Sequence, residues 1–571
     1  MPEYDVIIIG GGMSGLCCAG YLGRAGLKTL VLEARGECGA HCESCEPSIP
    51  GFLHNLHTTW MITATSPAMG DLDLERFGME FVASDIAYAK TFSDGKNALL
   101  CADPMETAAH WEKLSGKDAS LMHKVVEHFL PEIMHIQEML HNYLFCGPSK
   151  EAEEAVGTFL DEFFRMAGLN ITWAQTNAMN GFELLDLMFE SEHIKTMIQS
   201  LSWISGVAPA HRGLGALGVA LLGLMTGPMF PVHLLKGGSH GATHALVKAA
   251  KAYGVKILPS CPVSEILVEN GAAQGVRLAE KGIYGGRTIT ASKVVSNLTA
   301  APTFLNLIGA KHMKPEIAGR IERFSYDEQN LLGVYYSLSG KPQFASSRFD
   351  EAINRCAMGY FGGDDTEKMK ELAASLGARR IHDPIVANWF IPTIVDSSQA
   401  PPGCHTSFVW FDVPPAPEAW KNMALDGFAS WDRIKNDLAD AVTDAYESYA
   451  PGFKKLILDR VVYSPLDMFR NNPSAVHGNC FGGSIRPDQF YFDRPVPGVC
   501  VGGGARTFME NLYLSNSIHP FGASWMASGY IAACEVAEDF GIRDQSWWKD
   551  KAFDWLLANG GRIQAETEVA Q

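Results

Sequence analysis

Three glycines and one acidic residue near the N-terminus have the types and spacing of a dinucleotide site. Gly10, Gly12 and Gly15 satisfy the pattern G-x-G-x-x-G. Such glycines permit a tight turn, a close approach of pyrophosphate to the backbone and close packing of a helix. Glu33 follows at the offset where a carboxylate accepts hydrogen bonds from ribose hydroxyls and repels a 2′-phosphate. We therefore predict that an adenine dinucleotide binds here.

These residues need a strand, a helix and a second strand to position them. Residues 5–9 form a β-branched run suited to a parallel strand that is buried on both faces. A helix is predicted from the glycine turn to about Ala25, with Gly26 as its C-terminal stop. The N-terminus of that helix supplies unpaired N–H groups for phosphate. The next strand ends at Glu33.

Resemblance to known enzymes specifies which dinucleotide is expected. The stretch "EARGECGAHCES", from Glu33 through Ala34, resembles the continuation found in FAD enzymes, where a short loop leads to a Gly-Gly turn near the flavin. Gly39-Ala40 takes the place of that turn, with alanine where the second glycine is usual. Further along, a helix after Gly237-Gly238, a hairpin around Asn270-Gly271 and a strand ending at Ser296-Asn297 follow the order of the FAD-dependent oxidoreductases.

The closing segment narrows the resemblance to one family. A strand-like run at 512–514 leads into "SNSIHPFGASWMASGYIAA", a turn followed by a helix of small residues. This resembles the C-terminal signature of the phytoene desaturase and carotenoid isomerase family, which includes retinol saturase-like proteins. That family usually has glycine where this chain has Phe521. The resemblance covers roughly residues 1–65, 230–310 and 475–540.

The resemblance implies that FAD is the cofactor and that both ends of the chain build its site. A second helix N-terminus would donate N–H groups to the pyrimidine oxygen of the flavin, where negative charge gathers as hydride is accepted. Small residues there would let the backbone approach the ring, and Val263 would meet adenine through its backbone. The residues expected to bind FAD are Gly10, Gly12, Gly15, Glu33, Ala34, Gly39, Ala40, Val263, Asn297, Gly503, Gly522, Ala523 and Ser524.

Candidates for proton transfer lie close to these segments. His519 is the leading candidate for a polar group beside the flavin ring, and His57 and Glu510 are the other catalytic candidates. A structural role for each histidine stays open, and so does a place in the site for Arg506 and Asn511. The cysteines around His41, in "CGAHCESCE", do not have a matched metal-ligand spacing. We expect reduced thiols and no metal there, with covalent flavin attachment as the alternative.

Composition excludes some partners. Lys and Arg total 46 against 64 Asp and Glu, a net charge of −18, so no nucleic acid partner is expected. The chain begins with a strand pattern rather than a leader, and its thirteen cysteines lack disulfide-like spacing, which favours a cytoplasmic location. The uncharged stretch 213–232 holds five glycines and two prolines, and we interpret it as a buried or substrate-lining segment rather than a membrane helix. Peripheral membrane contact and oligomerisation stay open.

The predicted fold is α/β, with a Rossmann-type FAD-binding domain interleaved with an α+β substrate domain of mixed sheet and helices. The FAD-binding domain is expected at 1–65, 230–310 and 475–545, the substrate domain at 66–229 and 311–474, and a C-terminal tail at 546–571. An apolar chamber is expected where the two domains meet.

The predicted function is that of an FAD-dependent dehydrogenase or desaturase. It would abstract hydride from an apolar, isoprenoid- or terpene-type substrate and pass electrons to a quinone, a carrier protein or oxygen. The alternatives are a redox-neutral polyene isomerase, an amine oxidase and, least favoured, a prenyl-binding carrier without flavin. The sequence does not distinguish among substrates or acceptors.

Overall fold

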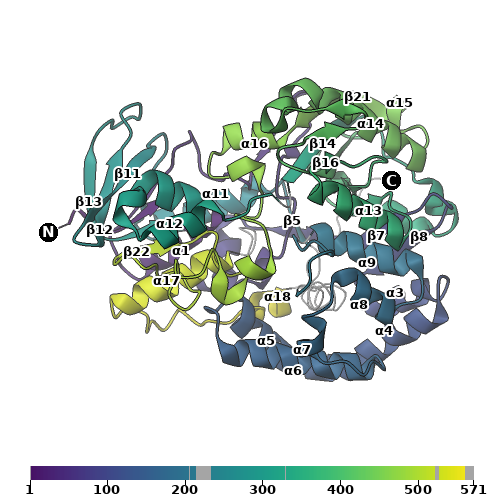
Figure 1. The fold of residues 1–571 in the computed structure, drawn as a ribbon, viewed down its shortest axis with the longest axis horizontal. Helices are drawn as coiled ribbons and strands as arrows, with labels where there is room; N and C mark the ends of the chain where they lie inside the picture. The colour runs from purple at the N-terminus through teal and green to yellow at the C-terminus, as the bar shows by residue number, and fades with distance from the viewer. Residues whose placement is uncertain (1, 205, 214–232, 328–329, 521–525, 560–571) are drawn as a thin grey trace.

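A computed structural model describes residues 2–204, 206–213, 233–327, 330–520 and 526–559 (Figure 1). The first sheet has five parallel strands in the order β10-β2-β1-β13-β22. Their bounds are Lys256–Leu258, Thr29–Leu32, Tyr4–Ile9, Thr288–Ser296 and Leu512–Leu514, respectively. Strands from the two ends of the chain therefore lie in one sheet, on either side of β13.

Strand β13 pairs with different neighbours along its two halves. Its first half pairs antiparallel with β12 (Ala272–Leu278), which forms a hairpin with β11 (Val263–Glu269). The turn between them places Asn270 and Gly271 at positive φ, +51° and +82°, as predicted for an Asn-Gly hairpin. The second half of β13 pairs with β1 and β22, so the hairpin extends the sheet without interrupting its parallel part.

Three helices pack together beside this sheet. Helix α1 (Met13–Arg24) follows β1 directly and contacts both α11 (His240–Ala252) and α17 (Ala527–Asp539). Almost every residue of α1 is buried, which matches its run of small and apolar side chains. Gly26, at φ +91°, follows the helix as the predicted stop. The N-terminal helix therefore lies between a helix from the middle of the chain and one from its end.

The second sheet has seven strands in the order β21-β14-β18-β17-β15-β7-β8. All neighbours are antiparallel except β15 and β7. The bounds in this order are Ile457–Tyr463, Asn330–Leu338, His405–Val413, Ala387–Phe390, Met358–Phe361, Ile86–Thr91 and Asn97–Cys101. One face packs on α14 (Trp431–Tyr449), while residues on the other face belong to the same hydrophobic core as the first sheet.

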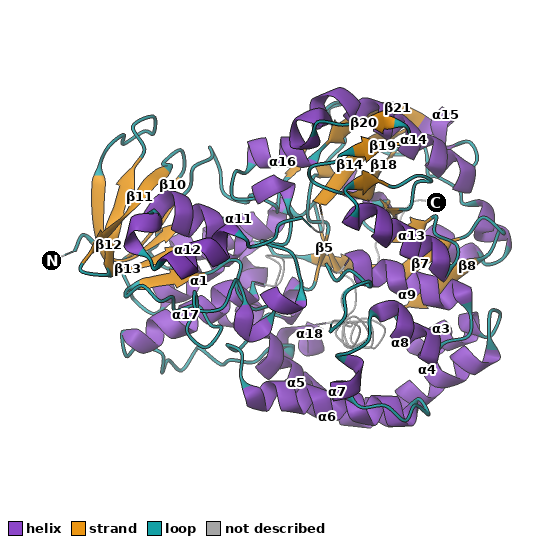
Figure 2. Ribbon diagram, in the orientation of Figure 1, coloured by secondary structure: helices purple, strands orange, loops and turns teal. Residues whose placement is uncertain are grey.

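A group of helices lies below this second sheet, at the lower centre and lower right of Figure 2. They are α3 (Pro104–Trp111), α4 (Gly116–Phe129), α5 (Ile133–Leu144), α6 (Lys150–Met166), α8 (Gly181–Met188) and α9 (Glu192–Ile204). Within this group, α3 contacts strand β8 of the sheet, and α9 contacts both β7 and β8. A further small sheet has three strands in the order β5 (Trp60–Met61), β9 (His233–Leu235) and β6 (Phe81–Ala83). In the described ranges, no helix has both the length and the apolar character needed to span a bilayer. The stretch 214–232 lies outside those ranges.

The predicted fold class is confirmed, with a Rossmann-type sheet and a mixed sheet covered by helices. Strands of the first sheet come from 1–65, 230–310 and 475–545, and strands of the second come from 66–229 and 311–474. The division into domains stays a prediction, because one core continues through both sheets.

The described part of the expected C-terminal tail packs onto the protein. Trp548 lies 4.7 Å from the ring of Tyr21 in α1, and the N–H of Phe553 donates to the carbonyl of Thr65 at 2.9 Å. The short helix α18 (Asp554–Asn559) follows.

Candidate active site

The turn between β1 and α1 has the close contacts that require glycine. A Cβ on Gly15 would lie 2.5 Å from the carbonyl oxygen of Gly10, and one on Gly12 would lie 2.8 Å from Nδ2 of Asn297. Helix α1 begins after Gly12 with no side-chain cap and no acidic residue in its first turn. The N–H groups at this helix start are therefore available to a diphosphate, which the helix dipole also favours.

Glu33 lies against the same turn. One carboxylate oxygen accepts the N–H of Gly11 at 2.7 Å, and the other accepts the N–H of Arg35 at 2.8 Å. The side chain is buried, so these bonds hold the carboxylate beside the glycine turn. The backbone carbonyl of Glu33 accepts the N–H of Cys261 at 2.8 Å, which places the start of β11, and thus Val263, next to this end of the site. Ala34 is exposed in the loop that follows.

The second turn, Gly39-Ala40, docks on the first. The N–H of Gly39 donates to the carbonyl of Gly11 at 3.1 Å. Gly39 has φ +137° and Ala40 has φ +49°, so the alanine occupies the left-handed region that normally favours glycine. The alanine that replaces the usual second glycine of this turn therefore has a strained backbone conformation.

Asn297 joins the start and the end of the chain. Its N–H donates to the carbonyl of Ile9 at 2.8 Å, which sets it beside the end of β1. Its side-chain oxygen accepts the hydroxyl of Ser515 at 3.1 Å, and its backbone carbonyl accepts Nδ2 of Asn516 at 3.2 Å. The carboxyl ends of β1, β13 and β22 therefore meet at one edge of the sheet, where ligands bind in such folds.

The helices that follow β1 and β22 also touch. The hydroxyl of Ser528 in α17 donates to the carbonyl of Ser515 at 3.0 Å and lies within hydrogen-bond distance, 3.1 Å, of the hydroxyl of Ser14. A Cβ on Gly529 would lie 2.0 Å from the carbonyl oxygen of Ser14, so α17 packs backbone to backbone on the start of α1. The expected convergence of the two ends is thus present. Gly522, Ala523 and Ser524 lie outside the described residues, and their contact with flavin stays a proposal.

His519 is buried between aromatic rings. Its Nε2 lies 2.5 Å from the carbonyl oxygen of Tyr143, and its ring packs edge-on against Tyr491 at 4.7 Å. Because a carbonyl only accepts, Nε2 must carry the hydrogen. Burial lowers the pKa of His519 to about 4, so the ring is neutral at physiological pH. The other nitrogen, Nδ1, is buried with no hydrogen-bond partner among the described residues and offers an acceptor.

His57 is buried, and neither of its ring nitrogens has a hydrogen-bond partner within the described ranges. It lies 5.0 Å from the ring of His41 and 5.4 Å from that of Tyr463 on β21. Burial, aided by His41, lowers the pKa of His57 well below its usual range. A buried polar ring in this setting is expected to gain partners from a bound ligand. His57 is therefore placed where the loop after the second turn meets the second sheet.

Two predicted residues do not join this cluster. Glu510 is exposed, and its carbonyl accepts the N–H of Ala273 in β12 at 2.9 Å. This argues against a catalytic role for Glu510, because the loop before β22 places it at the hairpin instead. Gly503, at φ +78°, packs against Phe492 and Pro148, which gives no support for a role in binding FAD.

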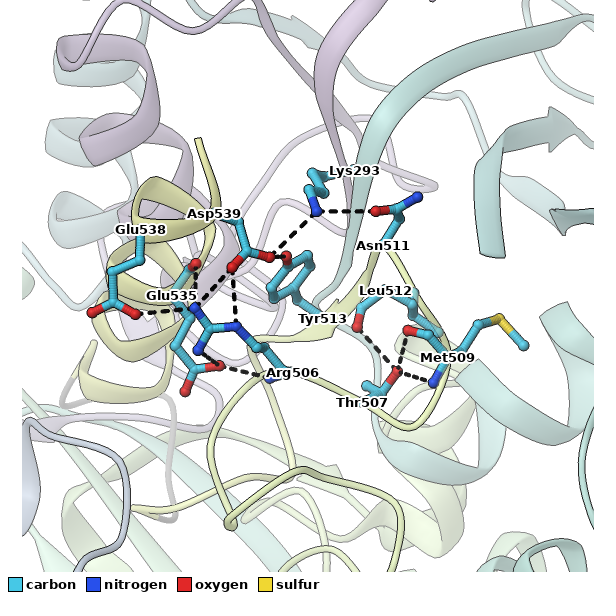
Figure 3. Close-up of polar contacts among 10 residues, drawn as sticks. All are labelled: Lys293, Arg506, Thr507, Met509, Asn511, Leu512, Tyr513, Glu535, Glu538 and Asp539. Atoms are coloured by element: carbon cyan, nitrogen blue, oxygen red, sulfur yellow. Dashed lines mark hydrogen bonds and ion pairs between the residues drawn. The ribbon is translucent and has the colours of Figure 1, made fainter. Parts of the chain in front are cut away.

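The loop before β22 is anchored from the far end of α17, as Figure 3 shows. Arg506 forms ion pairs with Glu535, Glu538 and Asp539 at 3.4, 3.0 and 3.0 Å. The backbone N–H of Arg506 also donates to Glu535, at 2.7 Å. Asn511 accepts a hydrogen bond from Lys293 at 2.9 Å. Arg506 and Asn511 thus fix the strand and the helix relative to each other rather than facing a ligand.

An aromatic face of the second sheet was not identified from the sequence. Three aromatic rings stack side by side across strands β14, β18 and β17. The ring of Phe408 lies 5.4 Å from that of Tyr335 and 4.4 Å from that of Phe390, and Trp410 lies 4.7 Å from Phe390. The hydroxyl of Tyr335 donates to the carbonyl of Leu56, two residues past His54. The alternation of side chains along β14 and β18 could have assigned residues to the two faces of the sheet. It could not have shown which face points toward the first sheet.

Comparison with known proteins agrees with this arrangement. A family model described as an NAD(P)-binding Rossmann-like domain matches residues 8–72. One of the proteins that make up limonene dehydrogenase in Castellaniella defragrans is 25% identical, over 96% of this chain and 97% of its own length. Phytoene desaturase (lycopene-forming) of Pseudescherichia vulneris is 24% identical, over 84% of this chain and 89% of its own.

The chain resembles the phytoene desaturase and carotenoid isomerase-like oxidoreductases, as its sequence motifs indicated. Among solved structures, cyclohexylamine oxidase from Brevibacterium oxydans has the same fold, with a TM-score of 0.54 at 14% identity over 95% of this chain and 100% of its own. The protein described by the present structure is an FAD-dependent oxidoreductase. Its described residues fit that cofactor, because the turns that need glycine, the uncapped start of α1 and the oriented carboxylate of Glu33 lie together.

Proposed function

We propose that this protein is a dehydrogenase or desaturase that removes hydride from an activated C–H bond of an apolar, terpene-type substrate. The observation that carries the proposal is the aromatic face of the second sheet, bonded through Tyr335 to Leu56 in the segment that continues from the second turn. An apolar, largely aromatic surface beside a dinucleotide site suits a hydrocarbon that makes few hydrogen bonds. The names of the limonene dehydrogenase and phytoene desaturase relatives support the same substrate class.

FAD, when bound, supplies the hydride acceptor. The chain holds its diphosphate at the start of α1 and its ribose at Glu33, and it orients the substrate against the stacked rings of the second sheet. His57 and His519 are neutral in this setting, so each offers a nitrogen lone pair to a proton without placing a fixed positive charge near the hydride acceptor. Exclusion of water by the surrounding aromatic side chains keeps the reacting carbon dry.

The electron acceptor is proposed to be a quinone, a carrier protein or oxygen. We place the enzyme in the cytoplasm, with contact to a membrane surface as a route for apolar substrates. Three of the relatives are named prolycopene isomerases, two from an Oncidium hybrid cultivar and one from Daucus carota, so redox-neutral isomerisation is the second candidate function.

Anaerobic incubation of the flavin-loaded protein with separate terpenes, polyenes and amines tests the proposal. Bleaching of the flavin absorbance by a terpene, with formation of a dehydrogenated product, is expected. Isomerised product without net bleaching would favour the second candidate. Bleaching by amines alone would overturn the substrate class. The flavin-loaded protein without substrate, incubated for the same time in the same light, is the control for photoreduction.

A further inference from the structure

A cavity of about 470 Å³ opens beside the end of β18 and is distinct from the glycine turns. It lies between the segment that follows α9, the turn after β18 and residues 477–486. Besides apolar side chains, its lining includes the ionisable residues His211, Asp327, Arg379, Asp412, His477 and Arg486. The cavity therefore has a mixed lining with several charges.

Asp412 is the unusual member of this lining. It is 3% exposed, and within the described part of the chain its carboxyl group has no hydrogen bond and no ion pair. The alternation of β18 places Asp412 on the same side as Phe408 and Trp410, while Val409 and Phe411 face α14. The carboxyl group thus continues the aromatic face of the sheet into the cavity.

The other charges of the cavity have partners. His477 lies 3.1 Å from Asp327, Arg486 lies 3.2 Å from Asp488, and Arg379 lies 3.5 Å from Glu418. Asp412 has no such partner among the residues that the structure describes, and burial raises its pKa to about 8. A carboxyl group in this setting keeps its proton at neutral pH, so that it can both donate and accept one hydrogen bond.

We propose that this cavity binds a hydroxyl group at one end of the apolar substrate, and that Asp412 is the residue that hydrogen-bonds it. The inference rests on the proposed function, whose aromatic face would hold the hydrocarbon part. A hydroxyl group complements a protonated carboxyl group in both directions of hydrogen bonding. An ammonium group is disfavoured, because the guanidinium groups of Arg379 and Arg486 also line the cavity.

Equilibrium binding to the flavin-loaded protein tests the subsite without turnover. Isothermal titration calorimetry would compare geraniol with its hydrocarbon counterpart 2,6-dimethyl-2,6-octadiene and with geranylamine. The wild type is expected to bind geraniol about tenfold more tightly than the hydrocarbon, the effect of one well-made buried hydrogen bond. Asp412→Leu should reduce that ratio to about one, and Asp412→Asn should retain part of it.

Asp327→Asn is the matched control, because it changes a carboxyl group of the same cavity that already has a partner, and the ratio should stay near the wild-type value. Flavin content and circular dichroism confirm that each variant is folded. An unchanged ratio in Asp412→Leu, tighter binding of geranylamine than of geraniol, or no binding of geraniol would each overturn the proposal. A ratio that depends on Asp412 without any flavin bleaching would leave the subsite standing and count against the proposed dehydrogenation.

Discussion

Replacing Gly529 with alanine tests whether the two ends of the chain must touch for the cofactor to bind. The new Cβ would lie 2.0 Å from the carbonyl oxygen of Ser14 and 2.7 Å from its carbonyl carbon. Because Cβ contacts essentially never fall below 3.0 Å, α17 must move from α1 by at least about 1 Å. That movement would stretch the 3.1 Å bond between Ser528 and Ser14 beyond hydrogen-bond length.

Overpacking at this backbone contact is expected to lower the free energy of unfolding by about 1–3 kcal/mol. Spread over a chain of 571 residues, such a loss lowers Tm by only about 1–3 °C. The effect on flavin content should be larger, since the clash falls on Ser14, which lies in the first turn of α1, where the diphosphate is proposed to bind. We expect the Gly529→Ala protein to purify with less than half of the wild-type flavin.

The assay is the ratio of flavin to protein absorbance after purification and after incubation with excess FAD. Gly70→Ala is the matched control, because Gly70 is also helical, is exposed and has no described atom within 4 Å of the added Cβ. Ser528→Ala removes the hydroxyl bond without adding bulk and should retain most of the flavin. If Gly529→Ala retains flavin and Tm as fully as Gly70→Ala does, contact between α1 and α17 is not required, and the reasoning fails.

Three further predictions concern single residues. Glu33→Gln should weaken FAD binding at least tenfold in a flavin titration, because it removes charge-assisted acceptance from the ribose; unchanged affinity would contradict the assignment. Ala40→Gly should raise the free energy of unfolding in urea by about 1 kcal/mol, since Ala40 has φ +49°; a decrease would show that the alanine methyl contributes packing. For Asp412, the folded chain holds a proton that the unfolded chain releases near pH 4, so the wild type should lose stability relative to Asp412→Asn by about 1.4 kcal/mol per pH unit from pH 5 to 7. Parallel pH profiles of the urea midpoints would refute the raised pKa.

The parts of the fold that were predictable have strong local signals. The β-branched run before Gly10 and the glycine spacing after it determine a strand, a turn and a helix within one short segment. Asn270-Gly271 likewise specifies its hairpin, because only residues tolerant of positive φ suit that turn. In each case the residues that determine the structure are close in sequence.

Two polar candidates, Glu510 and Arg506, could not be placed from the sequence, because their positions depend on the direction of a side chain or a loop. Glu510 lies two residues before β22, yet the loop brings its carbonyl to β12 and leaves the side chain exposed. Arg506 was recognised as a polar candidate, but its partners are three acidic residues about thirty positions later on α17. Such long-range pairings leave no local signature.

Two features had signals that sequence reasoning did not use. Trp547 and Trp548 are adjacent aromatic residues in the segment predicted as a tail, and both pack on Tyr21. Asp412 is an acidic residue within the otherwise uncharged run "TSFVWFDV" of β18, on the side of the alternation that carries Phe408 and Trp410. A charge at an inward position of an apolar strand is rare unless it is paired or functional.

The strand order explains why residues five hundred positions apart form one site. Since β1, β13 and β22 are adjacent and parallel, the residues that follow them, Gly10, Asn297 and Ser515, must lie at the same edge of the sheet. Helices α1 and α17 both start from that edge, so their N-termini point into the same space. The bond from Tyr335 to Leu56 joins the second sheet to the segment that continues from the second turn, and we propose that its aromatic face lies toward the site of hydride acceptance. A reaction at this position therefore depends on strand order rather than on any one motif.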